Sequence, residues 1–250
     1  MLFIDSSLSE VGKYCRFMYQ VVSRPEKWSV FGRRLLEEIN KLGVDSLGIV
    51  TLISFFIGAV ITIQVANNLD NPFIPKYTVA FAARETIVLE FSATIVCLIL
   101  AGKVGSNISS EIGTMRITEQ IDALDIMGIN SAAYLAGPKI LAMILSVPVL
   151  VVYSIFIGII GGVMAGSYTG LVPLDDFIVG LHFTFKPYYI AYTLFKSTLF
   201  AYIISSVSSY FGYNLRGGAL EVGKASTRSV VVSCVLILMV NLMVTQFLLS

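Results

Sequence analysis

Five long apolar stretches, separated by shorter polar segments, set the pattern of this chain. Each is long enough for a helix to cross the hydrocarbon core of a bilayer, which is about 30 Å thick and takes about 20 residues. We expect the spans at residues 46–66, 78–101, 140–165, 187–211 and 229–249. The sequence therefore predicts an all-α integral membrane protein with about five transmembrane helices, built as one domain over residues 1–250.

The composition supports this class of protein. Hydrophobic residues make up 56% of the 250 residues and charged residues 13%, whereas about 25% of the residues of a soluble domain are charged. The cysteines, Cys15, Cys97 and Cys234, are too few and too scattered for a disulfide framework or a metal site. We therefore expect no metal in this chain.

Residues 102–130 form the longest polar segment between two spans. At helical spacing its apolar residues fall near one stripe, and its charged residues, Glu111, Arg116 and Glu119 among them, lie largely away from that stripe. The segment is mostly acidic, whereas a helix held on anionic lipid is expected to be basic. The pattern favours a coupling segment, residues 102–137, that docks into a soluble partner. A solvated loop with some helix is the alternative.

The N-terminal part, residues 1–45, contains a second amphipathic pattern. Between positions 25 and 43, apolar residues led by Trp28 recur at steps of three and four, with charged and mostly basic residues on the other face. Such a helix suits the headgroup region of a membrane, and a soluble helix packed on a partner is the alternative. Residues 1–24 show no clear pattern.

Lysine and arginine residues predict the orientation. They are frequent before the first span, in the 102–139 segment and in the 212–228 segment, whereas the remaining loops contain only Lys76 and Lys186. Because cytoplasmic loops carry the excess of Lys and Arg, we expect a cytoplasmic N-terminus.

Charged residues inside the apolar stretches are the sharpest functional signal, since each costs about 3 kcal/mol in the membrane unless it is paired or hydrated. Arg84, Glu85 and Glu90 lie in the second span and Lys196 lies in the fourth. Arg84 and Glu85 are neighbours that point about 100° apart around a helix, so we expect each to find a partner elsewhere, with Lys196 the partner of Glu85. Buried ion pairs that fix helix register and a polar cavity for a charged headgroup both remain open.

Two further patterns concern packing and chemistry. Gly158, Gly162 and Gly166 recur every four residues and would let two helices approach closely, within one chain or between two copies. Residues 218–225 nearly match a phosphate-binding loop, but Ala225 stands where a hydroxyl would hold magnesium. We therefore expect no catalytic role and no cofactor here, with ATP and magnesium on a partner subunit.

The polar segment also carries a family resemblance. A Gly-basic-x-Gly start leads into a run of matched residues, and the match continues through Gly161 and Gly162 and through residues 212–230. The chain resembles the MlaE family (also called YrbE) of ABC-transporter permeases. The matched residues are Gly102, Lys103, Gly105, Glu111, Ile112, Gly113, Met115, Arg116, Thr118, Glu119 and Gln120.

This resemblance implies a homodimeric permease in the inner membrane of a diderm bacterium, which moves phospholipid between the inner and outer membranes and maintains outer-membrane lipid asymmetry. The implied partners are an MlaF-like ABC ATPase, an MlaD-like MCE-domain protein and, as a further possible partner, an MlaB-like STAS-domain protein. The segment 102–130 would contact the ATPase. By the resemblance, the contact residues would be Glu111, Arg116 and Glu119, and the polar residues near the lipid pathway would be Arg84, Glu85 and Lys196.

Two departures from the family pattern affect the charged residues. Thr86, Ile87 and Val88 follow the Arg-Glu pair where many members have Leu-Gly-Pro, and Asn241 stands where members often have an aspartate. The resemblance therefore implies that an acid partner for Lys196 from the last span is missing in this chain. The alternative function is a stand-alone secondary transporter driven by an ion gradient. Five spans do not divide into two equal repeats, which argues against it.

Overall fold

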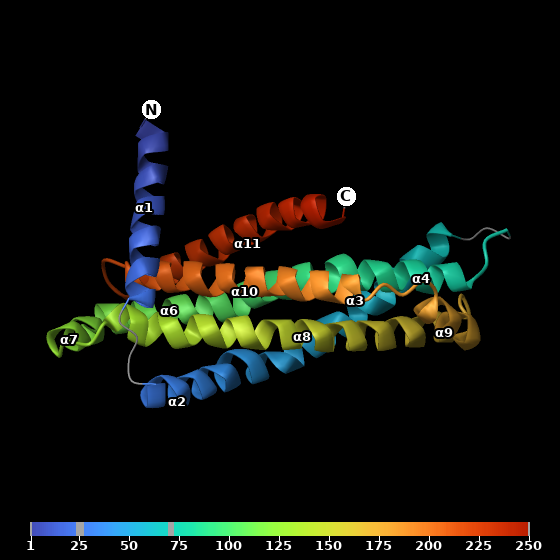
Figure 1. Cartoon of the computed structure of the whole chain (residues 1–250), viewed down its shortest axis with the longest axis horizontal. Helices are drawn as coiled ribbons and strands as arrows, with labels where there is room; N and C mark the ends of the chain where they lie inside the picture. Colours follow the sequence, from blue (N-terminus) through green and yellow to red (C-terminus); the bar gives the residue numbers. More distant parts are fainter. Residues whose placement is uncertain (1, 24–27, 70–72, 250) are drawn as a thin grey trace. The chain divides into compact units, whose positions relative to one another are not determined.

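The computed structural model of this chain describes the backbone of residues 2–23, 28–69 and 73–249, and it contains helices but no strand within those residues (Figure 1). The prediction of an all-α protein is confirmed. The α-helices are α1 (Leu2–Val22), α2 (Trp28–Glu38), α3 (Leu47–Asn68), α4 (Tyr77–Thr86), α5 (Val96–Leu100), α6 (Ser106–Ile117), α7 (Gln120–Ile126), α8 (Ser131–Thr169), α9 (Leu174–His182), α10 (Tyr188–Tyr213) and α11 (Ala219–Leu249).

Five continuous helical stretches are long and apolar enough to cross a membrane, as the sequence predicts. They are Val30–Asn68, Tyr77–Ile117, Ser131–Thr169, Tyr188–Tyr213 and Ala219–Leu248. The first three contain 39, 41 and 39 residues. At about 1.5 Å per residue each is about 60 Å long, twice the thickness of the hydrocarbon core. Their polar ends therefore project well beyond the apolar part of a bilayer.

The N-terminal amphipathic segment and the first part of the 102–130 segment are extensions of these long helices, and α7 forms a separate helix after the second of them. After α2 the chain continues through a π-helical turn, Ile39–Gly43, and a 3₁₀ turn, Val44–Ser46, directly into α3. In the same way α6 continues the second span. Because the apolar and polar parts lie on one helical rod, the sequence pattern alone gives no boundary between them. The side chain of Trp28 lies outside the described residues.

The chain divides into two compact units, and several long helices contribute residues to both. The first unit consists of Met1–Val44, Leu100–Ser146 and Phe200–Met239, and the second of Asp45–Ile99, Val147–Leu199 and Val240–Ser250. The first unit therefore holds the N-terminal helices and the coupling segment. The second holds most of the apolar residues of the first three spans and all of α9.

Each unit has its own apolar core. In the first unit α1, for which the sequence shows no pattern, packs Phe17 against Ala136, Ile140 and Tyr210. In the second unit Phe177 of α9 packs with Ala80 of α4 and neighbouring residues. These contacts fix α1 and α9 on the long helices within their own units.

Small residues bring α3 and α8 into close contact inside the second unit. A Cβ atom placed on Gly58 would collide with the carbonyl group of Gly158, and one placed on Gly162 would collide with the hydroxyl of Thr62. At Gly166 the nearest side chain, Val172, would lie at an ordinary distance of 3.5 Å. Gly158 and Gly162 thus serve packing within one chain, while a role between two copies stays a prediction.

The second span changes its helical type directly after Arg84 and Glu85. A π-helical segment, Ile87–Ile95, follows α4 and contains Glu90, and a second one, Ala101–Gly105, precedes α6. Thr86 and the two residues after it, where many family members have Leu-Gly-Pro, lie at the start of the first π-helical segment, and without a proline the backbone continues as a helix. π-helical turns inside longer helices are frequent at functional sites.

Candidate functional site

The outer face of the coupling segment is a corner between α6 and α7. Glu119 lies at the turn with a φ of 59°, in the left-handed region that side chains other than glycine rarely adopt. The guanidinium of Arg116 donates to Asp122 at 2.7 Å and connects the two helices. α7 buries Ile121 but leaves Ile126 87% exposed. The corner therefore presents charged and apolar groups together on an exposed surface.

The inner face of α6 carries an ionic cluster that the sequence did not reveal, and we refer to it as the Lys139 cluster. The ammonium group of Lys139 donates to Glu38 at 2.6 Å and to Glu111 at 3.0 Å, and Glu111 also accepts from Lys41 at 2.6 Å. The side chain of Lys139 is only 2% exposed. The cluster thus joins α6 to α8 and to the helical stretch that follows α2.

This cluster changes the picture of Glu111. The sequence pattern places Glu111 largely away from the apolar stripe, but its carboxylate is half-buried and holds two of the chain's own lysines. Glu119 is exposed, whereas the Arg116 side chain, at 34% exposure, is about as accessible as that of Glu111 at 31%. Contact of all three with an ATPase remains a prediction.

The polar centre of the second unit, which we name the Lys196 cluster, surrounds a completely buried lysine. Lys196 donates to Glu90 at 2.9 Å, to the carbonyl of Leu89 at 3.3 Å and to the hydroxyl groups of Tyr192 and Thr245 at 3.1 and 3.4 Å. The side chain of Glu90 is 37% exposed, whereas that of Lys196 is 0% exposed. The predicted pairing of Lys196 with Glu85 is therefore wrong. Glu90 lies further along the second span and faces the lysine directly.

Lys196 nevertheless has an acid partner, because Glu90 of the second span supplies the carboxylate that Asn241 lacks. Asn241 instead supports that carboxylate. Its amide donates to Glu90 at 3.2 Å, and its carbonyl oxygen accepts from Thr94 at 3.1 Å. Since Thr245 also donates to Glu90 at 3.1 Å, neutral groups complete the cluster.

Arg84 and Glu85 form a second polar group in the same unit. The guanidinium of Arg84 donates to Glu85 at 2.8 Å, so the expectation that these neighbours cannot satisfy each other is wrong. The arginine side chain is long enough to reach around the helix to the next residue. It also donates to the carbonyls of Leu181 at 2.6 Å and Phe183 at 3.1 Å, at the C-terminal end of α9.

The surroundings of Arg84 indicate a structural task. Its side chain is 4% exposed, and its guanidinium carbon lies 5.1 Å from the ring centroid of Phe81 and 5.7 Å from that of Phe185. The last carbonyls of a helix attract a cation. The structure thus separates the three predicted intramembrane residues: Arg84 and Glu85 hold the end of α9, and Lys196 belongs to the Lys196 cluster.

Comparison with known proteins supports the resemblance seen in the sequence. A family model described as "Permease MlaE" matches residues 35–247. A probable ABC transporter permease protein of Rickettsia bellii is 32% identical over 236 residues, which cover 94% of this chain and 91% of that protein. A probable ABC transporter permease protein of Synechocystis is 32% identical over 209 residues, covering 84% and 79%.

A plant relative extends the comparison. The protein named trigalactosyldiacylglycerol 1, chloroplastic, of Arabidopsis thaliana is 28% identical over 228 residues, which cover 91% of this chain and 65% of that protein. The family match includes both the Lys139 cluster and the Lys196 cluster. This chain belongs to the MlaE family of ABC transporter permeases.

Proposed function

We propose that this chain is the non-catalytic, homodimeric permease subunit of an ABC transporter that moves phospholipid between the inner and outer membranes of a diderm bacterium. It would lie in the inner membrane with its N-terminus in the cytoplasm and would maintain outer-membrane lipid asymmetry. Membership of an ABC permease family implies a separate ATPase partner. ATP and magnesium would bind to that subunit, MlaF-like in character. An MlaD-like MCE-domain protein and an MlaB-like STAS-domain protein complete the proposed assembly.

The observation that carries this proposal is the continuity of the second span with the coupling segment. The helix runs from Tyr77 to Ile117 and contains Glu90, Glu111 and Arg116. A displacement imposed on the exposed corner by a closing ATPase would therefore act on a rod that also bears the buried polar groups. This arrangement suits transport driven by a soluble partner.

A lipid cargo is supported by two independent observations. The Arabidopsis relative is named for a diacylglycerol lipid, and the Lys196 cluster provides a charged group inside an otherwise apolar span. The ammonium of Lys196 lies among hydroxyl groups and the partly exposed carboxylate of Glu90. A polar group of this kind suits an amphiphile that has both a charged headgroup and acyl chains.

An ion-driven transporter would use Glu90 and Lys196 as a relay and would need no ATPase. Family membership favours the ATPase-coupled proposal, and co-purification can decide between the two. We would tag the chain at its own locus, purify it in mild detergent and identify the bound molecules by mass spectrometry. We expect a stoichiometric ATPase, an MCE-domain protein and phospholipid.

Reconstitution into liposomes provides the second readout. Lipid transfer that needs ATP and is inhibited by vanadate would support the proposal. Transfer that follows a proton gradient and continues without an ATPase would contradict it.

A further inference from the structure

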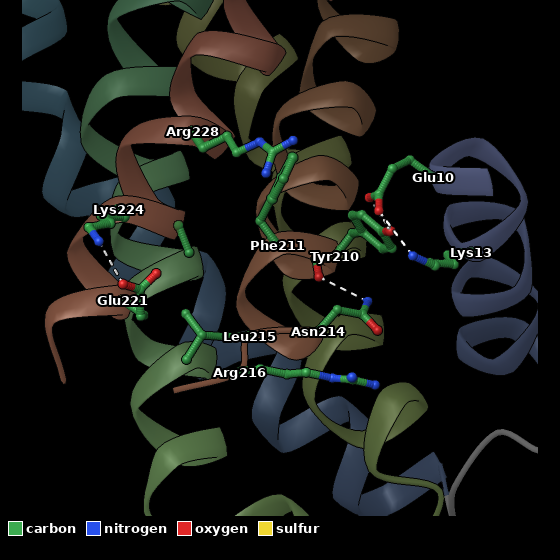
Figure 2. A pocket seen from close by; sticks show the side chains of 11 residues that line it. Glu10, Lys13, Tyr210, Phe211, Asn214, Leu215, Arg216, Glu221, Lys224 and Arg228 are labelled. Carbon is green, nitrogen blue, oxygen red and sulfur yellow. Dashed lines mark hydrogen bonds and ion pairs between the residues drawn. The ribbon is translucent and has the colours of Figure 1, made fainter. Parts of the chain in front are cut away.

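A cavity of about 580 Å³ opens in the first unit between α1, the end of α10 and the beginning of α11 (Figure 2). Neither the Lys139 cluster nor the coupling corner contributes to it. Figure 2 shows Arg228 and Arg216 at opposite ends, with Tyr210, Phe211 and Leu215 between them. The cavity thus has a largely apolar floor and a basic rim.

The two acids of the cavity are already neutralised within their own helices. Glu10 accepts from Lys13 at 3.1 Å and from the hydroxyl of Tyr210 at 3.0 Å. These hydrogen bonds from Lys13 and Tyr210 hold the pKa of Glu10 below its ordinary value. Glu221 accepts from Lys224 at 2.7 Å. Neither carboxylate therefore needs an arginine of the rim.

The two arginines lack such partners. Within residues 9–23, 30–69 and 73–248, no hydrogen bond or ion pair is formed by Arg216 or Arg228. Arg228 lies over the ring of Phe211, at 5.5 Å from its centroid, and its charge contributes in a minor way to the lowered pKa of Glu10. Guanidinium groups bind phosphate and carboxylate groups through paired N–H donors. The rim therefore offers two guanidinium groups to an anion.

The position of the cavity along the chain indicates which anion it meets. Tyr210 and Phe211 lie at the end of the fourth span, and aromatic residues at such ends mark the level of the lipid headgroups. The surrounding segment, 212–228, is one of those with an excess of basic residues, so the proposed orientation puts it on the cytoplasmic side. The volume also falls in the usual range for a ligand site, about 300 to 1,000 Å³.

We propose that this cavity binds an anionic phospholipid from the cytoplasmic leaflet, with its phosphate group at one of the two arginines, Arg216 or Arg228, that lie at the ends of the cavity. The glycerol part would lie on Phe211 and Leu215. Such a lipid would connect α1 to the α10–α11 turn, where Tyr210 and Glu10 already form a hydrogen bond. The proposal does not depend on the nature of the transported cargo. An acidic segment of a partner protein would also suit the arginines, but it would not need an aromatic floor at headgroup level.

Binding measurements on the purified full-length chain test this site. Affinity for phosphatidylglycerol in bicelles would be compared between the parent, the double variant Arg216→Gln/Arg228→Gln and the control Arg16→Gln. Arg16 is an exposed arginine of the first unit that lies outside the cavity. Since a basic residue near the membrane surface contributes about fivefold to binding of anionic lipid, we expect the double variant to bind about 25-fold more weakly and the control to bind as the parent does.

Further binding measurements distinguish a lipid phosphate from the phosphate of a soluble compound. Phosphatidylcholine and glycerol 1-phosphate should bind much more weakly than phosphatidylglycerol. Equal binding of glycerol 1-phosphate would overturn the lipid proposal in favour of a soluble phosphate compound. Unchanged phosphatidylglycerol binding in the double variant would also overturn it, and if that variant then loses a co-purifying protein, the site serves a protein partner.

A second measurement protects the test against a folding defect. A photo-crosslinking residue at Ala225, which lines the cavity, should label phosphatidylglycerol in a chain that retains both arginines. Compared with labelling in Arg216→Gln/Arg228→Gln, labelling should be partly restored in Arg216→Lys/Arg228→Lys. If position 225 labels no more lipid than position 16 does, the cavity does not hold a lipid.

Discussion

The two buried lysines of this chain, Lys139 in the first unit and Lys196 in the second, are neutralised in different ways. Lys139 contacts two carboxylates, one of which also holds Lys41, so its cluster contains two positive and two negative groups. Lys196 contacts one carboxylate, that of Glu90, and its other partners are neutral oxygens. Both lysine side chains are almost fully buried, so burial does not distinguish the two sites.

The difference decides how each site should respond to the loss of one charge. Removing one member of a buried ionic group leaves the others uncompensated, whereas replacing the whole group with neutral side chains is often tolerated. The Lys139 cluster has few neutral groups to compensate such a loss, and one oxygen of Glu38 is buried without a partner among the described residues. The Lys196 cluster has several neutral donors. We therefore expect the Lys139 cluster to be needed for stability. In the Lys196 cluster, we expect that both charges can be removed together without preventing folding.

The largest expected effect is that of Lys139→Met. It leaves Glu38 and Glu111 facing each other with only Lys41 nearby, and we expect the free energy of unfolding to fall by about 4 kcal/mol. The measurement is a thermal unfolding curve of the purified protein, together with its elution on size exclusion. The matched control is Glu38→Gln/Glu111→Gln/Lys139→Met. It also removes the two carboxylate charges that the single variant leaves unpaired, and it should recover at least half of the lost free energy of unfolding. Equal Tm values for the parent and the single variant would contradict the prediction.

A somewhat smaller effect is expected for Lys196→Met. Glu90 loses its ion pair but keeps hydrogen bonds from Asn241 and Thr245, so we expect a loss of about 3 kcal/mol. The double variant Glu90→Gln/Lys196→Met removes both charges and should return to within about 1 kcal/mol of the parent.

This double variant also sharpens the comparison between the clusters. If the charges of the Lys196 cluster serve transport, the double variant should fold normally and yet lose at least tenfold in ATP-dependent lipid transfer between liposomes. Normal transfer in the folded double variant would make the cluster purely structural, and the distinction from the Lys139 cluster would disappear.

Arg84→Ala should have an intermediate and local effect. The substitution frees the carbonyls of Leu181 and Phe183 and leaves Glu85 unpaired, at a cost of about 2 kcal/mol. Hydrogen–deuterium exchange should increase at the end of α9 and remain unchanged around the Lys139 cluster. Arg84→Lys, which keeps the charge but not the forked donors, should show a smaller increase. Protection of α9 equal to that of the parent would contradict a structural task for Arg84.

The sequence predicted the class and the spans well because apolar length is a direct requirement of the bilayer. It also identified every charged residue of the second and fourth spans. It failed at their partners, since Glu85 and Glu90 are equally acidic in the sequence and only the helical register decides which of them faces Lys196. The prediction that Arg84 and Glu85 would not pair failed for a related reason. The angle between their Cα–Cβ directions does not limit the reach of a side chain as long as that of arginine.

The Lys139 cluster had a weaker signal that could have been noticed. Lys139 is a single cation at the start of an otherwise apolar stretch, a position where burial requires a counter-ion. Its partners are 28 and about 100 positions away in the chain, so no local pattern joins them. α1 was missed because its apolar contacts, such as Phe17 on Tyr210, form only in the folded unit.

The smallest effect on stability, and the most informative one for function, is expected at the exposed pair of Arg116 and Asp122. Exposed ion pairs contribute about 0.5 kcal/mol, so Arg116→Asp should barely change the Tm. If an ATPase contacts the charged groups of this corner, the variant should lose most lipid-stimulated ATP hydrolysis in the assembled complex. The swapped variant Arg116→Asp/Asp122→Arg restores the pair but inverts the surface that a partner would meet. If the swapped variant remains inactive, Arg116 contacts a partner directly. If the swapped variant recovers activity, Arg116 only holds the corner of α6 and α7. Full activity in Arg116→Asp would show that Arg116 has no part in coupling.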